Sequence, residues 1–303
     1  MRGLVIYLFI AFGGGYLIDF VWLLPNSDNS LAFQIGASVR MFMPLLGVLA
    51  VRLFKVERFS KFDVGLCIGK PFWLFLAPVI PLLVWGISIL LHKLFGWAVF
   101  SWAEMIDAMT QTATQHGQSD DNVVAFFTWL KNNPFLSMIF IVGSSVFAGV
   151  SINALFAFGE EIGWRGYLIH KLFSKNFYVQ VVAIGLIWGL WHAPLIFALG
   201  YNYPGFQGWV PLIAFIFFTI SVSYVLNNLR VLSGSVFPVT LVHGTVNAIG
   251  GLMLLSSGEN ALIGGSAGLV TSLSWLLIGA LLDVIRQKYG ITTCEKAETP
   301  AIT

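Results

Sequence analysis

Residues 209–229 read WVPLIAFIFFTISVSYVLNNL and contain no charged side chain. Residues 4–24 read LVIYLFIAFGGGYLIDFVWLL and contain a single charged side chain, that of Asp19. About 20 consecutive apolar residues, wound as an α-helix, are long enough to cross the hydrocarbon core of a bilayer. Because such stretches recur along the 303-residue chain, the sequence predicts an all-α, polytopic membrane protein.

The composition excludes several other classes of protein. Hydrophobic residues make up 57% of the chain and charged residues only 10%, whereas a soluble domain carries about 25% charged residues. A water-soluble or disordered protein is therefore excluded, and a membrane β-barrel would show short alternating segments instead. The net charge of +2 comes from dispersed basic residues, so we expect no nucleic-acid partner.

Eight segments are long and apolar enough to span the membrane. They cover residues 4–24, 31–54, 71–95, 145–172, 177–199, 209–229, 235–256 and 265–285. The fourth belongs to an apolar stretch, 135–173, that is too long for one straight crossing, and Gly143–Ser145 is the expected bend.

Basic residues set the orientation of these spans. Arg2, the cluster 52–70, Lys171, Arg230 and Arg286 all fall on the same side when the eight spans alternate in direction. Because Lys and Arg are enriched in cytoplasmic loops, we expect both termini to be cytoplasmic.

The spans divide the chain into three parts. Residues 1–135 hold the first three spans and an outer interfacial loop at about 96–134, which contains three tryptophans. Residues 136–256 form the predicted core with spans four to seven. Residues 257–303 supply the last span and a cytoplasmic tail.

Three of the core spans carry polar motifs, although each ionisable residue inside a membrane helix costs on the order of 3 kcal/mol. The motifs are FGEEIGWRG at 158–166, WGLWHAP at 188–194 and HGTVN at 243–247. With a rise of 1.5 Å per residue, all three lie roughly 15–22 Å from the cytoplasmic helix ends. The sequence therefore predicts that side chains from three helices meet at one level.

Helical spacing sorts these side chains further. Glu161 and Arg165 are i, i+4 neighbours, so we expect a buried ion pair that supports the structure. Glu160 points about 100° away from Glu161 and is left for another partner. His243 and Asn247 share one helix face.

Water activation is the chemistry that fits this set. A carboxylate near a histidine, Glu160 with His192, can take a proton from water and pass it to a leaving amine. His243 and Asn247 can donate hydrogen bonds to the oxyanion of a tetrahedral intermediate, each such donor being worth roughly 3–4 kcal/mol. Alternatively, Glu160, His192 and His243 can ligate a divalent metal such as zinc, with a position left open for water.

Two further pairs shape the packing of the spans. Gly185 and Gly189 form a small-xxx-small motif that allows another helix to approach closely just before His192. Asp19 and Arg40 lie at similar distances from the outer ends of the first two spans, so we expect them to form a buried ion pair outside the site.

The three motifs resemble those of the CPBP family of intramembrane endopeptidases, which includes CAAX proteases and bacteriocin-processing (Abi) proteins. The family pattern is E-E-x-x-x-R, an aromatic residue ahead of a histidine, and H-x-x-x-N. Here it is matched by Glu160-Glu161…Arg165, by Trp188…His192 and by His243…Asn247. Trp188 stands where the family most often has Phe, and the similarity covers about residues 150–250.

The resemblance implies an eight-helix protein that cleaves a peptide bond near the cytoplasmic membrane face. It assigns water activation to Glu160 and His192 and oxyanion stabilisation to His243 and Asn247. The family mechanism has been described both as glutamic and as metal-dependent. We favour the reaction without a cofactor, because an asparagine is better suited to donating a hydrogen bond than to ligating zinc.

The expected substrate is a membrane-embedded or lipidated peptide or protein, and the expected location is a prokaryotic plasma membrane. Two other functions remain open. Buried Glu and His residues also build the proton relays of transporters, although no inverted repeat is visible in the sequence. A non-catalytic immunity or scaffold protein could retain the same residues for structure alone.

Overall fold

The computed structural model describes residues 2–97, 101–115, 120–172, 175–255 and 260–289, and all regular secondary structure within these residues is helical. The predicted all-α class is therefore confirmed. The helices are α1 (Arg2–Ile18), η1 (Asp19–Leu23), η2 (Leu24–Asn26), α2 (Ser30–Arg40), α3 (Met43–Leu53), α4 (Pro71–Leu76), α5 (Val79–Leu94), α6 (Trp102–Gln115), α7 (Asp121–Asn132), α8 (Pro134–Val150), α9 (Ile152–Glu161), η3 (Ile162–Leu168), α10 (Ile169–Lys171), α11 (Phe177–Trp191), α12 (Ala193–Leu199), α13 (Trp209–Ser233), α14 (Phe237–Leu255), α15 (Ala261–Gly264) and α16 (Leu269–Tyr289).

The length and hydropathy of these helices make the chain an integral, multi-pass membrane protein. Within the described residues, four helical stretches can each cross a membrane, and two sharply bent pairs raise the number to six. The four stretches are Arg2–Asn26, Ser30–Leu53, Trp209–Ser233 and Ala261–Tyr289, and they coincide with the first, second, sixth and eighth predicted spans. The bent pairs are α7 with α8, at 113°, and α11 with α12, at 51°.

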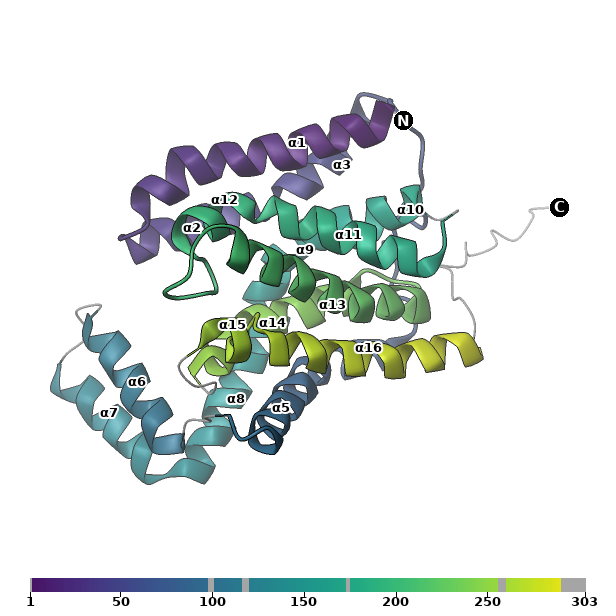
Figure 1. Ribbon diagram of the computed structural model, residues 1–303. Helices are drawn as coiled ribbons and strands as arrows, with labels where there is room; N and C mark the ends of the chain where they lie inside the picture. The colour runs from purple at the N-terminus through teal and green to yellow at the C-terminus, as the bar shows by residue number, and fades with distance from the viewer. Residues whose placement is uncertain (1, 98–100, 116–119, 173–174, 256–259, 290–303) are drawn as a thin grey trace.

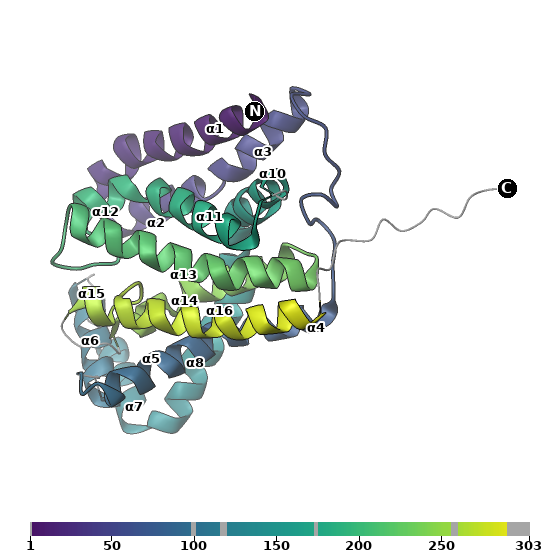
Figure 2. The same ribbon diagram turned by 45° about the vertical axis from the view of Figure 1, so that its right-hand side comes forward.

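Helix α13 lies at the centre of the bundle, where it packs against α11 on one side and α16 on the other. In both views, α1, α11, α13 and α16 follow one another across the molecule (Figures 1 and 2). The small residues Gly185 and Gly189 explain the close approach of α11 to α13. A Cβ atom on Gly185 would lie 2.5 Å from Ile220 Cα, and one on Gly189 would lie 2.7 Å from Thr219 Oγ1. The close helix contact predicted from these two glycines is thus confirmed.

The fourth apolar stretch does not bend where the sequence suggested. Helix α8 runs without interruption through Gly143–Ser145, where Ser144 Oγ donates to the carbonyl oxygen of Ile141. The break falls at Ser151, whose φ of −111° and ψ of −95° lie outside the helical region. Tertiary packing sets this position, because a Cβ on Gly149 would lie only 2.6 Å from Thr245 Cα in α14.

The predicted outer loop at 96–134 contains a helical hairpin of α6 and α7. The hairpin forms a small core of its own with α8 and α14, made of Met105, Ile106, Leu130, Ile141 and Leu252. Trp102 Nε1 donates to the carbonyl oxygen of Leu130 at 3.1 Å and joins the two helices. This pair lies at the lower left of Figure 1, apart from the central bundle. The domain boundaries at 135 and 256 remain predictions.

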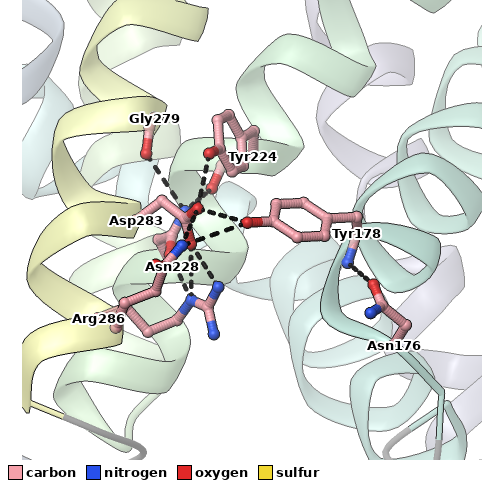
Figure 3. A network of polar contacts seen from close by, with 8 residues as sticks. Asn176, Tyr178, Tyr224, Asn228, Gly279, Asp283 and Arg286 are labelled. Carbon is pink, nitrogen blue, oxygen red and sulfur yellow. Dashed lines mark hydrogen bonds and ion pairs between the residues drawn. The ribbon is translucent and has the colours of Figure 1, made fainter.

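A polar network joins α11, α13 and α16 near the C-terminal end of α16 (Figure 3). Asp283 Oδ2 accepts hydrogen bonds from Tyr178 at 2.8 Å and from Tyr224 at 3.0 Å, while Oδ1 pairs with Arg286. Arg286 Nε also donates to Asn228 Oδ1 at 2.9 Å. Each oxygen of the Asp283 carboxylate therefore has a donor, Oδ2 from α11 and α13 and Oδ1 from Arg286 of the same helix, as a largely buried charge requires.

Candidate functional site

Two adjacent glutamates end helix α9 at the start of the site. Glu160 is 2% exposed and Glu161 is fully buried. The helix continues as the π-helix η3, which is wider than an α-helix and is frequently found at functional sites. This segment packs against α3 and α13, so both carboxylates lie inside the bundle.

Glu161 forms the ion pair that its spacing predicted. Arg165 Nη1 lies 2.9 Å from Oε1 and 3.1 Å from Oε2 of Glu161, and both side chains are fully buried. Arg165 Nη2 donates to Ser223 Oγ at 2.7 Å. The guanidinium carbon lies 4.6 Å from the centre of the Trp188 ring, a cation–π arrangement.

A second contact of Glu161 was not foreseen from the sequence. His243 Nδ1 of α14 lies 2.7 Å from Glu161 Oε1. A carboxylate at this nitrogen orients the imidazole and leaves Nε2 facing away from Glu161. The i, i+4 spacing predicts only the contact with Arg165, because both residues lie in the same helical segment. His243 lies 82 residues further along the chain, on another helix, so the spacing does not predict its contact with Glu161.

Glu160 contacts two indoles. Its Oε2 accepts hydrogen bonds from Trp164 Nε1 at 3.1 Å and from Trp188 Nε1 at 2.7 Å. Its Oε1 receives no hydrogen bond from the described residues. One oxygen of the carboxylate is therefore fixed in place, and the other is available to a water or a substrate. Both tryptophans belong to the motifs quoted from the sequence, but the sequence alone does not identify either of them as a hydrogen-bond donor to Glu160.

His192 lies where α11 ends. Its Nδ1 is 3.0 Å from the carbonyl oxygen of Trp188, so this nitrogen carries the proton and Nε2 holds the lone pair. The ring is half-buried and contacts Trp191 and Phe215, with centroid separations of 4.9 Å and 5.0 Å.

The Trp188 ring packs close to both histidines. Its centroid is 6.1 Å from that of His192 and 5.3 Å from that of His243. Since Trp188 also donates to Glu160, motif side chains of α9, α11 and α14 form one cluster. The meeting of three helices that the sequence predicted is present in the structure, whereas the catalytic roles of the residues remain predictions.

Asn247 lies one turn beyond His243 on α14. Its side chain is exposed and forms no hydrogen bond with the described residues. An amide that is open to the surroundings has both donors free for a ligand.

The geometry also bears on the alternative metal site. Among the described residues, no three His, Cys, Asp or Glu side chains lie together in a way that could hold a metal ion. Glu160 Oε2 is occupied by two indole N–H groups, and His243 Nδ1 by Glu161. These contacts leave Glu160 Oε1 and the Nε2 atoms of His192 and His243, so the metal alternative remains a prediction, and no step is assigned to a metal.

The arrangement supports proton transfer and anion stabilisation. It offers a carboxylate with one free oxygen on Glu160, an imidazole lone pair on His192 and a second imidazole on His243, whose Nδ1 faces a carboxylate. These are the groups needed to activate a nucleophile and to stabilise a developing negative charge.

Parts of the sequence that contain this cluster are similar to known proteins. Residues 134–249 match the family model of the type II CAAX prenyl endopeptidase Rce1-like proteins. The resemblance stated from the three motifs is thereby confirmed over that segment. A stretch of 39 residues is also 46% identical to CAAX prenyl protease 2 of Methanococcus maripaludis. That stretch covers 12% of this chain and 14% of the curated relative.

The segment matched by the Rce1-like model contains the whole predicted site: Glu160, Glu161, Arg165, His192, His243 and Asn247. It excludes the first 133 residues, so helices α1 to α7 lie outside the match. What these helices contribute to the site must therefore be inferred from their contacts.

Proposed function

We propose that the protein is an intramembrane endopeptidase that hydrolyses a peptide bond of a membrane-associated or lipidated substrate. One observation carries the proposal. Glu160, with one oxygen fixed by two indoles and the other unoccupied, lies in one cluster with His192 and His243 inside an apolar helical bundle. Similarity to Rce1-like CAAX prenyl endopeptidases over 134–249 supports it.

In the proposed reaction, Glu160 and His192 share the activation of one water. The free oxygen of Glu160 accepts one proton of the water, and the Nε2 lone pair of His192 accepts a hydrogen bond from its other O–H group, as the water oxygen attacks the peptide carbonyl. The carbonyl oxygen then carries the negative charge of a tetrahedral intermediate. When the C–N bond breaks, Glu160 returns that proton to the nitrogen of the leaving amine.

The developing oxyanion is stabilised from α14. Glu161 faces His243 Nδ1 and so holds the ring in a fixed orientation, and we assign to Nε2 of this ring the hydrogen bond to the oxyanion. The Asn247 amide supplies a second donor from the next turn of the helix. Each donor is expected to contribute roughly 3 kcal/mol to stabilisation of the transition state.

The substrate class follows from where the site lies. Glu160 and His243 are enclosed by helices whose outer surfaces carry exposed apolar side chains such as Phe9, Phe147 and Leu281. A substrate held in the bilayer by a lipid or a membrane segment reaches such a site along the membrane. A prenylated C-terminal peptide is our first candidate, in line with the name of the curated relative.

We further propose the complete topology of eight spans, with both termini in the cytoplasm and the chain in a prokaryotic plasma membrane. The alternation of basic residues supports it. So do helices α4 and α5 in the region of the third predicted span and α14 in that of the seventh. The partners are then the lipid bilayer and the substrate, with no nucleic acid.

The test is cleavage by purified protein reconstituted in liposomes. A prenylated peptide and its unprenylated form are compared with wild type, Glu160→Ala and His192→Ala, and Glu104→Ala is the control because Glu104 is an exposed acid on α6. We expect cleavage by wild type and the control, and at least a 1,000-fold loss in the other two. Full cleavage by both site variants would refute the mechanism. Proton-coupled solute flux without cleavage would instead establish a transporter.

A further inference from the structure

The helix that carries His192 is interrupted directly beside it. Helix α11 ends at Trp191, and α12 leaves at an angle of 51° with Pro194 as its second residue. Proline has no N–H group, so the carbonyl of Leu190, four residues earlier, lacks its usual helical donor. Inside a membrane, carbonyl groups released in this way require donors from elsewhere in the protein.

Two of the donors come from the N-terminal helices. The hydroxyl of Tyr16 in α1 donates to the carbonyl oxygen of Leu190 at 2.7 Å. Arg40 Nη2, at the end of α2, donates to the carbonyl oxygen of Trp191, the residue that precedes His192. Both donors lie more than 90 residues before the segment that matches the Rce1-like model.

Arg40 is itself held in a fixed position. Its Nε lies 2.5 Å from Asp19 Oδ1 and its Nη2 lies 3.1 Å from Asp19 Oδ2, and both side chains are almost fully buried. The ion pair predicted from the sequence is therefore confirmed. The guanidinium carbon also lies 3.5 Å from the centre of the Trp191 ring. Trp191 Nε1 in turn donates to the carbonyl oxygen of Ala11 in α1 at 2.8 Å.

These contacts connect the ion pair to the imidazole. The backbone N–H of His192 bonds to the carbonyl oxygen of Gly189 at 3.1 Å, which leaves the Trp188 carbonyl to accept from His192 Nδ1. The proton on Nδ1, and hence the lone pair on Nε2, therefore depends on how α11 ends. Arg40 and Tyr16 contact the two carbonyls that determine that end.

We infer that Tyr16 and the Asp19–Arg40 ion pair are positioning residues that hold His192 in the tautomer and orientation required for water activation. The inference rests on the proposed function, because it assigns these residues a task within that reaction. It also assigns a role in the site to an N-terminal part of the chain, whereas the sequence alone predicts that the Asp19–Arg40 pair lies outside the site.

A positioning role predicts a specific pattern of kinetic change. Loss of Arg40 displaces the imidazole by a fraction of its own width and leaves the Trp191 carbonyl without a donor, while the surfaces that bind the substrate are unchanged. A displacement of this size costs on the order of 10- to 100-fold in rate. We therefore expect Arg40→Ala to lower kcat by that factor and to leave KM within about 2-fold.

The matched control is Arg286→Ala. Arg286 also belongs to a largely buried ion pair, with Asp283, but its contacts lie near the C-terminal end of α16, away from His192. The Arg286→Ala variant loses a comparable interaction but keeps the end of α11 intact, so its kcat should remain near that of wild type. Arg40→Lys keeps the charge and one donor and should recover part of the lost rate. Tyr16→Phe removes a single hydroxyl group and should also lower kcat. This variant tests the inference even if Arg40→Ala does not fold.

A second readout does not depend on cleavage. In protein labelled with ¹⁵N at histidine, the ring resonances of His192 are assigned by their loss in His192→Ala. We expect them to report one tautomer in wild type and Arg286→Ala, and to change in Arg40→Ala and in Tyr16→Phe. If wild type cleaves no substrate, the proposed function fails while the nitrogen spectra still test the positioning role. Unchanged His192 resonances in both variants, or a kcat loss equal to that of Arg286→Ala, would overturn the inference.

Discussion

Trp188 is the residue that connects the parts of the site. Its indole N–H donates to one oxygen of Glu160, its ring contacts both histidines, and its carbonyl oxygen accepts a hydrogen bond from His192 Nδ1. Three of these contacts depend on the ring, whereas the carbonyl is available in any residue. An indole also supplies a donor that a phenyl ring lacks, so this position can orient the Glu160 carboxylate as well as pack against it.

Replacing Trp188 by Phe isolates that donor. Trp188→Phe removes the 2.7 Å hydrogen bond to Glu160 and retains an aromatic ring in the same space. A hydrogen bond to a charged group contributes about 1.5–3 kcal/mol, so we expect kcat to fall at least 10-fold in the cleavage assay. Trp209→Phe is the control, because Trp209 is 69% exposed. Equal rates for wild type and Trp188→Phe would show that Trp164 alone suffices.

The pair of Glu161 and Arg165 supports a second residue-scale prediction. Glu161→Ala leaves a fully buried guanidinium without its carboxylate, which costs about 3–5 kcal/mol. The double variant Glu161→Gln with Arg165→Met removes both charges and should recover most of that stability. Reversible unfolding in detergent measures both effects. If the double variant is no more stable than Glu161→Ala, the loss does not arise from an uncompensated charge.

At the scale of helices, glycines allow α14 to pack closely against α8 and α9. Gly244, next to His243, faces the carbonyl oxygen of Gly149 in α8, and a Cβ there would also lie 2.7 Å from the nitrogen of Ala154 in α9. Both obstacles are backbone atoms, which cannot move aside as a flexible side chain can. The contact of His243 with Glu161 therefore depends on close packing of α14 against α8 and α9.

Gly244→Ala tests this dependence. The added methyl group must push α14 away from α8 and α9, and overpacking of this kind costs about 1–3 kcal/mol. We expect lower thermal stability together with a loss of cleavage, because His243 moves away from Glu161. Gly250→Ala is the control on the same helix, since nothing lies within 4 Å of a Cβ at Gly250. Similar activity of the two variants would show that the helix contact is not tight.

These elements also show what the sequence could predict. The convergence of three polar motifs followed from counting residues along each helix, and two ion pairs followed from the spacing or depth of Glu161–Arg165 and Asp19–Arg40. The partners Trp188–Glu160 and His243–Glu161 did not follow, because they join residues from different helices whose rotation is set by packing. For the same reason, the break in the fourth span lies at Ser151 and not at Gly143–Ser145.

At the scale of the whole molecule, the loop after α3 is fixed to the core segment. Lys171 Nζ and the hydroxyl of Tyr167 both donate to Glu57, each at 2.8 Å. Burial alone would raise the pKa of the Glu57 carboxyl, but the hydrogen bonds from Lys171 and Tyr167 and the Lys171 charge lower it below its ordinary value of 4.5. Glu57 thus connects the N-terminal helices to the end of η3.

This lowered pKa has a definite consequence for stability. The contribution of Glu57 is present above pH 4.5 and is lost as the pH falls through its folded-state pKa. Glu57→Gln should therefore lower the unfolding temperature at pH 6, by the equivalent of about 1 kcal/mol, and have less effect at pH 3. An equal difference at the two pH values would mean that the ionised carboxylate is not the stabilising group.

The topology is the last property of the whole molecule to test. With eight spans and a cytoplasmic N-terminus, the loop near Lys61 lies inside the cell and the α6–α7 hairpin lies outside. Alkaline phosphatase fused after Thr110 should then be active, because it folds only outside the cytoplasm, and a fluorescent reporter fused after Lys61 should be bright. The reversed pattern would place the loop containing Glu57 on the outside and would contradict the inference from basic residues. It would also contradict the expectation that cleavage takes place near the cytoplasmic face, which the proposal of a cytoplasmic prenylated peptide as substrate requires.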